Sequence, residues 1–388
     1  MNLKRNRSIG VKIIGGALFI VLIWVAADMW YSDTKQVAAV PLQLTEQQSP
    51  LLLFVAKHMM SSDGGVFTNL RDDLPESEHQ AANHQMLSES TGLMMLYAVQ
   101  MNNRNLFDNQ LAFLQRRLLA EKGYVRWRYS PKHEPTDVNA AVDDLRIARA
   151  LLDADQLWGV EEARRIAKGI SKTLLDGNVS QDYMFDHYDW KYKSRSDRAT
   201  ISYMDIHTMG MLAVFDKKWE TVRNNSLQLM KNGSLGNGLF KTYWTPDQGY
   251  SSTGSINMID SLYTALYLAE EGEDVSATIR FLKQEWSLHK GKIPSVYAED
   301  GSVQETFESP SVYALAVRIL HLKNEHGLAE QLKRRMYAFA VQRASSPNFG
   351  GFVEEKDNSA FSFDQLQVLL TEVSPSGSKK NEIRGKVK

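Results

Sequence analysis

The sequence predicts an all-α protein in which paired helices form a toroid of two concentric rings. Apolar residues recur at spacings of three and four in many windows, which is typical of helices with one buried face. Many predicted helices form close pairs, and longer loops separate the pairs. No repeat of fixed length is visible, which disfavours a regular solenoid. The predicted helices span 47–62, 88–101, 104–119, 140–156, 160–175, 203–215, 217–231, 255–271, 274–287, 310–324, 326–342 and 362–371.

Helix-start and helix-end signals support this pattern. Ser88 with Glu89 marks one helix start, and Ser309 followed by a proline marks another. Gly272 and Gly327 mark short turns between paired helices. The loops between pairs are long, and loops of this length in a compact domain are usually functional. We expect six of them to gather at one end of the toroid and shape a cleft: 63–85, 124–138, 179–202, 232–254, 293–309 and 345–360.

The first residues predict a membrane tether. Four basic residues, the last of them Lys12, precede an uncharged apolar stretch at 13–27, and this is the pattern of a signal anchor or a signal peptide. A retained anchor would hold a single-pass protein in the cell membrane with its main domain outside. A cleaved signal would make the protein secreted, and a buried soluble helix is the third interpretation. The predicted organisation is therefore 1–31 signal anchor or signal peptide, 32–46 linker, 47–373 helical domain and 374–388 disordered tail.

Composition excludes several classes of function. The formal net charge of −1 in 388 residues gives no basic field for nucleic acid. The chain contains no cysteine, so disulfides, thiolate metal sites, a catalytic thiol and a lipid attached to cysteine are excluded. Asp205 and His207 form an Asp-x-His pair, but without further ligands this pair is weak evidence for a metal, and we predict none.

Three acidic segments are candidates for chemistry, and each has two interpretations. Glu89 at a helix start could complement the helix dipole, or could be a proton donor whose pKa is raised by burial. Asp143 and Asp144 could also serve the dipole, with Asp143 paired to Arg146 three residues later, or one could grip substrate. Asp260 lies among apolar residues, so it is either paired with an arginine or catalytic.

Read together, these segments resemble glycoside hydrolase family 8. Residues 88–95 (Ser-Glu-Ser-Thr-Gly-Leu-Met-Met) resemble the family's helix start that carries its general acid. Residues 127–129 (Trp-Arg-Tyr) and the helix from Asp144 to Leu152 resemble the next motif. Residues 201–203 (Ile-Ser-Tyr) and 259–263 (Ile-Asp-Ser-Leu-Tyr) resemble the last two motifs, in the same order as in the family.

The resemblance implies an (α/α)6 toroid of six helical hairpins and hydrolysis of a glycosidic bond with inversion. It implies Glu89 as the general acid, Asp260 as the general base and Asp144 as the group that grips and distorts the sugar ring. No metal or cofactor is required. Candidates for binding substrate are Trp127, Tyr129, Tyr188, Trp190, Tyr203, Asp205 and Trp244.

The chain departs from the family's pattern at the cleft. Ser90 and Thr91 replace a Gly-Gln pair, Val142 replaces the first aspartate of an Asp-Ala-Asp motif, and Tyr263 lies near the family's arginine. We therefore expect a bacterial exopolysaccharide rather than cellulose or plain xylan as substrate, with exopolysaccharide synthesis proteins as further partners. One alternative is a non-catalytic exopolysaccharide-binding or assembly protein. Another is a polysaccharide lyase that uses His207 with Tyr203.

Overall fold

The computed structural model describes residues 37–45, 47–77 and 80–374. The chain divides into two units, Met1–Ala38 and Ala39–Lys388, and the fold below belongs to the second. The predicted signal anchor or signal peptide (1–31) lies outside the described residues, as does the predicted tail from residue 375 onward. Within the described ranges, no helix combines the length and the apolar character that a membrane span requires.

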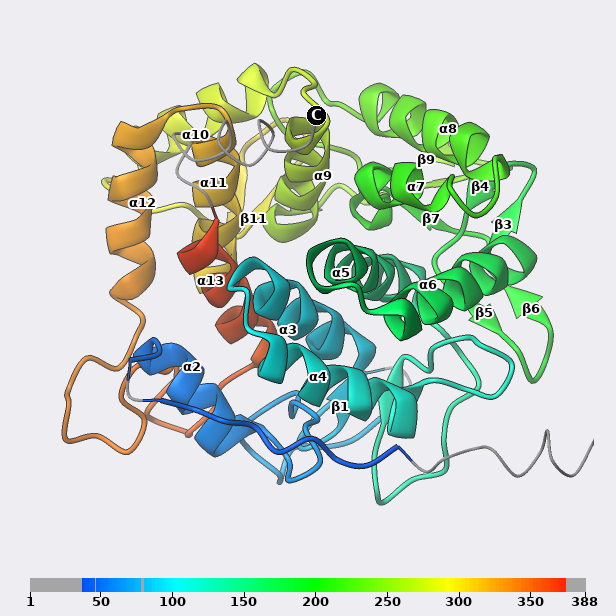
Figure 1. The fold of residues 1–388 in the computed structure, drawn as a ribbon. Helices are drawn as coiled ribbons and strands as arrows, with labels where there is room; N and C mark the ends of the chain where they lie inside the picture. The colour runs from blue at the N-terminus through cyan, green and yellow to red at the C-terminus, as the bar shows by residue number, and fades with distance from the viewer. Residues whose placement is uncertain (1–36, 46, 78–79, 375–388) are drawn as a thin grey trace, which may run out of the picture. The chain divides into compact units, whose positions relative to one another are not determined.

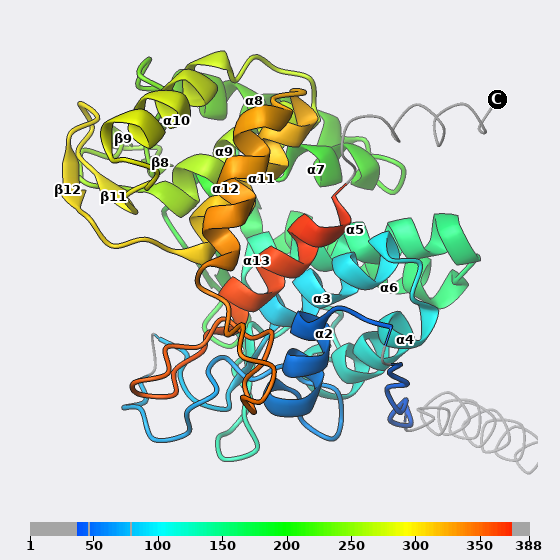
Figure 2. The same cartoon turned by 90° about the vertical axis from the view of Figure 1, so that its left-hand side faces the viewer.

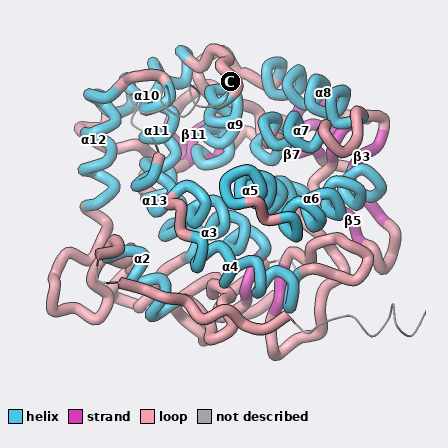
Figure 3. The backbone as a smooth tube through the Cα atoms, in the orientation of Figure 1, coloured by secondary structure: helices cyan, strands magenta, loops and turns pink. Residues whose placement is uncertain are grey.

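The prediction of an all-α protein is confirmed. Twelve α-helices lie in the described residues, joined by long loops and very short strands (Figures 1 and 3). Each predicted helix has a counterpart within a few residues. Their bounds are α2 Pro50–Phe54, α3 Ser88–Gln100, α4 Arg104–Phe113, α5 Ala141–Trp158, α6 Glu161–Thr173, α7 Ile206–Leu212, α8 Lys218–Asn232, α9 Met258–Glu270, α10 Ser276–Leu288, α11 Pro310–Leu322, α12 His326–Tyr337 and α13 Ser362–Val373.

Six of these helices form a closed inner ring. Helix α3 packs on α5, α5 on α7, α7 on α9, α9 on α11 and α11 on α13, and α13 then packs on α3. The intervening helices lie outside them, as α4 does against α3, α6 against α5 and α12 against α11 (Figure 1). The connectivity is therefore two concentric rings, as the helix pairing predicts.

The amino-acid pattern explains which helices lie inside. In α3 every residue from Ser90 to Val99 is buried, so this helix is apolar or small all round and can only be stable in the interior. Helix α6 instead buries a single stripe that includes Ala163, Ile166, Ala167 and Ile170, while its other face carries charge. A one-sided stripe of this kind is typical of an outer helix that covers a core.

Some helix boundaries differ from the prediction. Three outer helices end in a π-helical turn, namely η1 Val55–Met59, η2 Leu114–Leu118 and η3 Leu174–Asn178, and hydrophobic spacing does not distinguish such a turn from an α-helix. The predicted turn at Gly327 is wrong, because Gly327 lies inside α12 and Asn324 takes the left-handed conformation instead. Gly272 does have a positive φ, of 85°.

Short strands and long loops gather on one side of the domain (Figure 2). Several strands lead directly into an inner helix, as β1 leads into α3 and β10 into α9. A short 3-10 helix, η4 Ile201–Tyr203, follows β7 in the same way. The strands are β1 Met86–Leu87, β2 Arg128–Tyr129, β3 Val179–Ser180, β4 Tyr183–Met184, β5 Tyr188–Asp189, β6 Ser194–Arg195, β7 Ala199–Thr200, β8 Tyr243–Thr245, β9 Gly249–Tyr250, β10 Ile256–Asn257, β11 Val296–Tyr297 and β12 Val303–Glu305.

Candidate active site

Two strand-to-helix junctions place the candidate carboxylates. Strand β1 pairs with β2, and the chain enters α3 at Ser88, so that Glu89 is the second residue of the helix. Strand β10 pairs with β11, and Asn257 then caps α9 by accepting a hydrogen bond from the Ile259 amide. Asp260 is consequently in the first turn of α9. Both carboxylates lie at the N-terminal end of an inner helix.

These helix starts converge on one cavity of about 280 Å³. Residues near the starts of α3, α5, α9 and α13 line the cavity, together with η4. The predicted residues Glu89, Asp260 and Tyr203 are therefore brought together. The full lining is Glu89, Val142, Arg146, Ser202, Tyr203, Ile259, Asp260, Tyr263 and Phe363.

Glu89 has the environment of a proton donor. Its side chain is only 28% exposed, and its Oε2 lies 3.7 Å from Nη1 of Arg146. Burial, helped by the negative charge of Asp143, raises the pKa of Glu89 to about 7, although Arg146 acts in the opposite direction. The favourable field of the helix start would also lower this pKa. Burial prevails, so at neutral pH a large fraction of Glu89 carries a proton to donate.

A buried ion pair supports Glu89 from α5. Arg146 Nη1 donates to Asp143 Oδ1 at 2.9 Å, which confirms the predicted pairing three residues apart. Ser88 Oγ donates to the other oxygen of Asp143 at 2.7 Å, so the residue before Glu89 is tied to the same carboxylate. The guanidinium of Arg146 also lies over the ring of Tyr263, 5.0 Å from its centroid. The charged groups around Glu89 are thus held in place by hydrogen bonds and ion pairs.

Asp144 does not line the cavity. It is fully buried and accepts a hydrogen bond from Asn139 Nδ2 at 2.7 Å, while its Oδ1 has no partner among the described residues. Asn139 is itself bonded to Asn178, so the Asp144 carboxyl lies toward the end of η3. Successive residues on a helix point about 100° apart, which directs Asp143 toward Glu89 and Asp144 away from it. At the cavity wall, Val142 presents an apolar side chain.

Asp260 faces the cavity with one hydrogen-bond donor. Ser202 Oγ donates to its Oδ1 at 2.9 Å. Burial raises the pKa of Asp260, and the bond from Ser202 opposes that rise by favouring the ionised form. The interpretation of Asp260 as half of an arginine ion pair receives no support from the described residues, in which Ser202 is the polar partner.

Tyr203 completes the polar part of the lining. Burial, followed by the charges of Asp186, Asp143 and Asp260, raises the pKa of its hydroxyl. Tyr203 therefore stays protonated and can donate a hydrogen bond. Asp186, which the sequence did not single out, accepts bonds from the amide and hydroxyl of Thr200, and burial raises its pKa to about 6.

The other predicted substrate-binding residues lie outside this cavity. Asp205 is buried, caps α7 by accepting bonds from Thr208, and lies 3.6 Å from Arg149. Tyr188 and Trp190 pack on each other and close over Gly177, with Trp190 stacked on Tyr124. The remaining three are half-buried: Trp127 beneath Arg128, Trp244 against Tyr183, and Tyr129 against Phe113.

Two of the departures from the family pattern turn out to serve packing. Ser90 forms a hydrogen bond of 3.0 Å with Ser362 of α13, and Thr91 Oγ1 donates to the carbonyl of Leu87. Both residues are fully buried. Among the described residues, no group of three or more histidine, aspartate or glutamate side chains is arranged to hold a metal ion.

Comparison with known proteins identifies the family. The model of the glycosyl hydrolases family 8 matches residues 55–269. The chain belongs to this family. It is 30% identical over 376 residues to a Bacillus subtilis protein named "Putative lipoprotein YdaJ", covering 93% of this chain and 96% of that one.

Solved structures share the fold of this chain. A protein described as a novel alpha-amylase from Clostridium perfringens is 29% identical, with a TM-score of 0.78 over 84% of this chain and 96% of that one. PssZ from Listeria monocytogenes is 22% identical, with a TM-score of 0.67 over 86% and 98% of the two chains, and at this identity it shows the fold alone. The family and the closed inner ring together confirm the (α/α)6 toroid. Membership of the family also confirms the prediction that the protein is a glycoside hydrolase.

Proposed function

We propose that this glycosidase hydrolyses a bacterial exopolysaccharide with inversion at the anomeric carbon, with Glu89 as general acid and Asp260 as general base. The observation that carries the proposal is that both carboxyl groups line one cavity, from helices that are not neighbours in the inner ring. An inverting enzyme needs two carboxyl groups on opposite sides of the scissile bond, with room between them for a water molecule.

In the proposed reaction, protonated Glu89 gives its proton to the glycosidic oxygen as the bond to the anomeric carbon breaks. Asp260 takes a proton from the water that attacks the opposite face of the sugar. Glu89 ends as a carboxylate and Asp260 as a carboxylic acid, and proton exchange with solvent restores both. The positive charge of Arg146, 3.7 Å from Glu89, stabilises the carboxylate that forms.

The roles around the two carboxylates differ from those that the resemblance implied. Asp144 is buried outside the cavity, so we do not assign it to the sugar ring. Tyr203 and Arg146, both in the lining, can donate hydrogen bonds to sugar hydroxyls. Phe363 and Tyr263 supply aromatic surface for the apolar faces of the ring.

We place the enzyme outside the cytoplasm and at the membrane. The B. subtilis relative is named a putative lipoprotein, whereas this chain has no cysteine to carry a lipid. The apolar stretch at 13–27, behind its basic flank, supplies the tether in this chain. In that position the enzyme meets polymers of the cell surface, and proteins of exopolysaccharide synthesis are its natural partners.

A second substrate deserves a direct test, because the relative from C. perfringens is described as an alpha-amylase. An α-linked glucan is also a neutral polysaccharide, and the cavity residues impose no requirement for a charged sugar. The two possibilities are distinguished by incubating the protein with poly-N-acetylglucosamine, as a probe for a neutral bacterial exopolysaccharide, and with soluble amylose, an α-linked glucan.

The proposal is tested by Glu89→Gln in the full chain. This change removes the donated proton and keeps the shape of the side chain, so we expect kcat to fall by at least about 10²-fold on the polymer that the wild-type protein cleaves. Glu121→Gln, in an exposed turn, is the matched control and should leave kcat unchanged. NMR of the first products should show the anomer opposite to that of the substrate.

Two results would contradict the proposal. Full turnover by Glu89→Gln would remove Glu89 from the acid role. Binding without turnover by the wild-type protein, on both polymers, would favour the alternative of a non-catalytic binding or assembly protein.

A further inference from the structure

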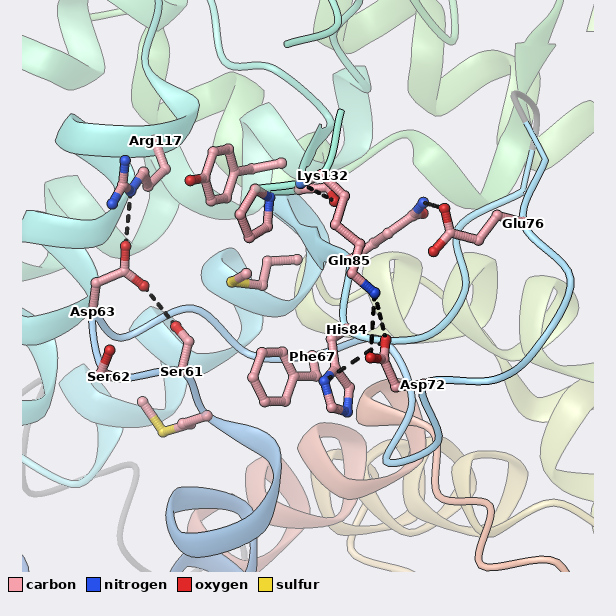
Figure 4. Close-up of a pocket in the computed structure, with 15 residues that line it drawn as sticks. Ser61, Ser62, Asp63, Phe67, Asp72, Glu76, His84, Gln85, Arg117 and Lys132 are labelled. Atoms are coloured by element: carbon pink, nitrogen blue, oxygen red, sulfur yellow. Dashed lines mark hydrogen bonds and ion pairs between the residues drawn. The ribbon is translucent and has the colours of Figure 1, made fainter. Parts of the chain in front are cut away.

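A second cavity, larger than the catalytic one, lies in the loops before α3. It measures about 580 Å³, which is within the usual range of roughly 300–1,000 Å³ for ligand pockets. Its walls come from residues 60–86, from η2 and from the segment after β2 (Figure 4). The catalytic assignment uses none of these side chains.

The two polar walls of this cavity are held by ion pairs. On one side, Asp63 accepts bonds from Arg117 Nε at 2.8 Å and from Ser61 Oγ at 2.6 Å (Figure 4). Burial alone would raise the pKa of Asp63, but these bonds lower it, so the carboxylate is ionised. On the other side, Asp72 lies 3.3 Å from Nζ of Lys132.

Each carboxylate that lines the cavity has a polar partner. Besides the pairs of Asp63 and Asp72, Glu76 is bonded to His133 Nε2 at 2.6 Å and to Gln85 Nε2 at 3.3 Å. Each of the three carboxylates therefore faces a positively charged or hydrogen-bonding partner. A charged ligand would lose hydration without meeting an unpaired opposite charge, so this lining favours a neutral polar ligand.

The floor of the cavity is apolar and aromatic. Phe67 and His84 stack with their ring centroids 4.1 Å apart and their planes 16° from parallel. Tyr129 lies nearby with the guanidinium of Arg117 over its ring. Aromatic surface framed by hydroxyl, carboxylate and amide groups matches a pyranose, which has apolar faces and a hydroxylated edge.

The second cavity is lined by the strand that leads into the helix of Glu89. Met86 of β1 lines the second cavity and pairs with Tyr129 of β2, which lines it too. Three residues after Met86, Glu89 lines the catalytic cavity. A ligand held in the second cavity is thus attached to the same strand-to-helix junction that positions the general acid.

We propose that the second cavity is an accessory binding site for a neutral glycan, which takes a remote segment of the polysaccharide whose bond is cleaved at Glu89. This inference rests on the proposed glycosidase function. Its consequence is that affinity depends on chain length: a long chain occupies both cavities, whereas a short oligosaccharide occupies only the catalytic one.

The test uses His84→Ala in the full chain. His84 is about one-third exposed, so its loss removes the stack on Phe67 with little expected effect on folding. On the polymer that is cleaved, amylose or poly-N-acetylglucosamine, we expect KM to rise about 5- to 10-fold with kcat unchanged, as befits the loss of one stacked contact. KM for the corresponding trisaccharide should not change.

Two further variants sharpen the result. His84→Phe keeps a ring on Phe67 and should restore the KM of the polymer, whereas His326→Ala, on α12, should have no effect. Equal changes in KM for polymer and trisaccharide, or no change for either, would overturn the proposal. If the wild-type protein cleaves neither polymer, the proposed function fails, and the accessory site is then judged by affinity electrophoresis in both polymers. In that experiment, His84→Ala should be retarded less by the polymer than the wild-type protein. Equal retardation of the two proteins would overturn the proposed accessory site.

Discussion

At the scale of single residues, the position of one carboxylate along α5 affects the pKa of Glu89, the proposed general acid. The sequence pattern directs attention to Asp144, because this residue matches the family's motif. The structure instead couples Glu89 to Asp143 and Arg146. The i,i+3 pairing within α5 could be predicted from spacing, but its contact with Ser88 of another helix could not, since spacing within one helix carries no information about its neighbour.

The coupling of Glu89 to Asp143 predicts that Asp143→Asn shifts the pH dependence of kcat/KM. A general acid acts while protonated, so in the proposed mechanism kcat/KM falls as pH rises through the Glu89 pKa of about 7. Removing the charge of Asp143 removes an influence that raises this pKa, and it leaves Arg146, which lowers the pKa, less neutralised. We expect the alkaline limb of the kcat/KM profile to move to lower pH by about 1 unit.

The matched control is Asp155→Asn near the other end of α5, where the profile should not move. An alkaline limb that stays in place or moves to higher pH in Asp143→Asn would show that Glu89 is not coupled to Asp143 as described.

At the scale of elements, the close approach of α3 and α5 fixes the geometry of the site. Gly92 allows this approach, since a Cβ there would lie 3.1 Å from Cβ of Arg146 and 3.2 Å from Cγ1 of Ile147. The helices themselves could be located from periodicity and helix-start signals. The π-helical turns and the loop conformations that build the accessory cavity could not, because neither leaves a repeat in the hydrophobic pattern.

A pair of glycine substitutions tests this approach. Gly169 of α6 has open space around it, so Gly169→Ala should raise the free energy of unfolding by about 1 kcal/mol through helix propensity. Gly92→Ala gains the same propensity but crowds Arg146 and Ile147, and overpacking costs about 1–3 kcal/mol. Denaturant unfolding should therefore show Gly92→Ala to be the less stable of the two. Equal free energies of unfolding for the two variants would mean that α3 and α5 move apart to admit the added methyl group without any loss of stability.

At the scale of the whole domain, the closed ring makes every inner helix a structural neighbour of two others. The concentric arrangement could be predicted from the paired helices, and the twelve helices predicted from periodicity gave the number of pairs. Closure itself depends on α13, which packs on both α3 and α11 and supplies Phe363 to the cavity that Glu89 and Asp260 line. Ser362 at its start bonds to Ser90 of α3 across the closure.

Removal of α13 should therefore prevent the whole domain from folding, rather than leave a stable domain that lacks one helix. A chain that ends at residue 361 leaves apolar faces of α3 and α11 uncovered, and we expect no cooperative thermal transition by circular dichroism. A chain that ends at Ser374 keeps every described contact and should melt as the full chain does. A cooperative transition in the shorter chain would show that five inner helices form a stable unit.

The contact between α3 and α13 also sets an order for folding. In an open array of repeats, each unit contacts only its neighbours in sequence, so folding can begin anywhere and spread. Here α13 must return to α3, and contacts of such long sequence separation form slowly. A chain emerging residue by residue from a ribosome or an export channel cannot close the ring until residues 362–373 have emerged. Until then it also cannot complete the cavity that Glu89 and Asp260 line.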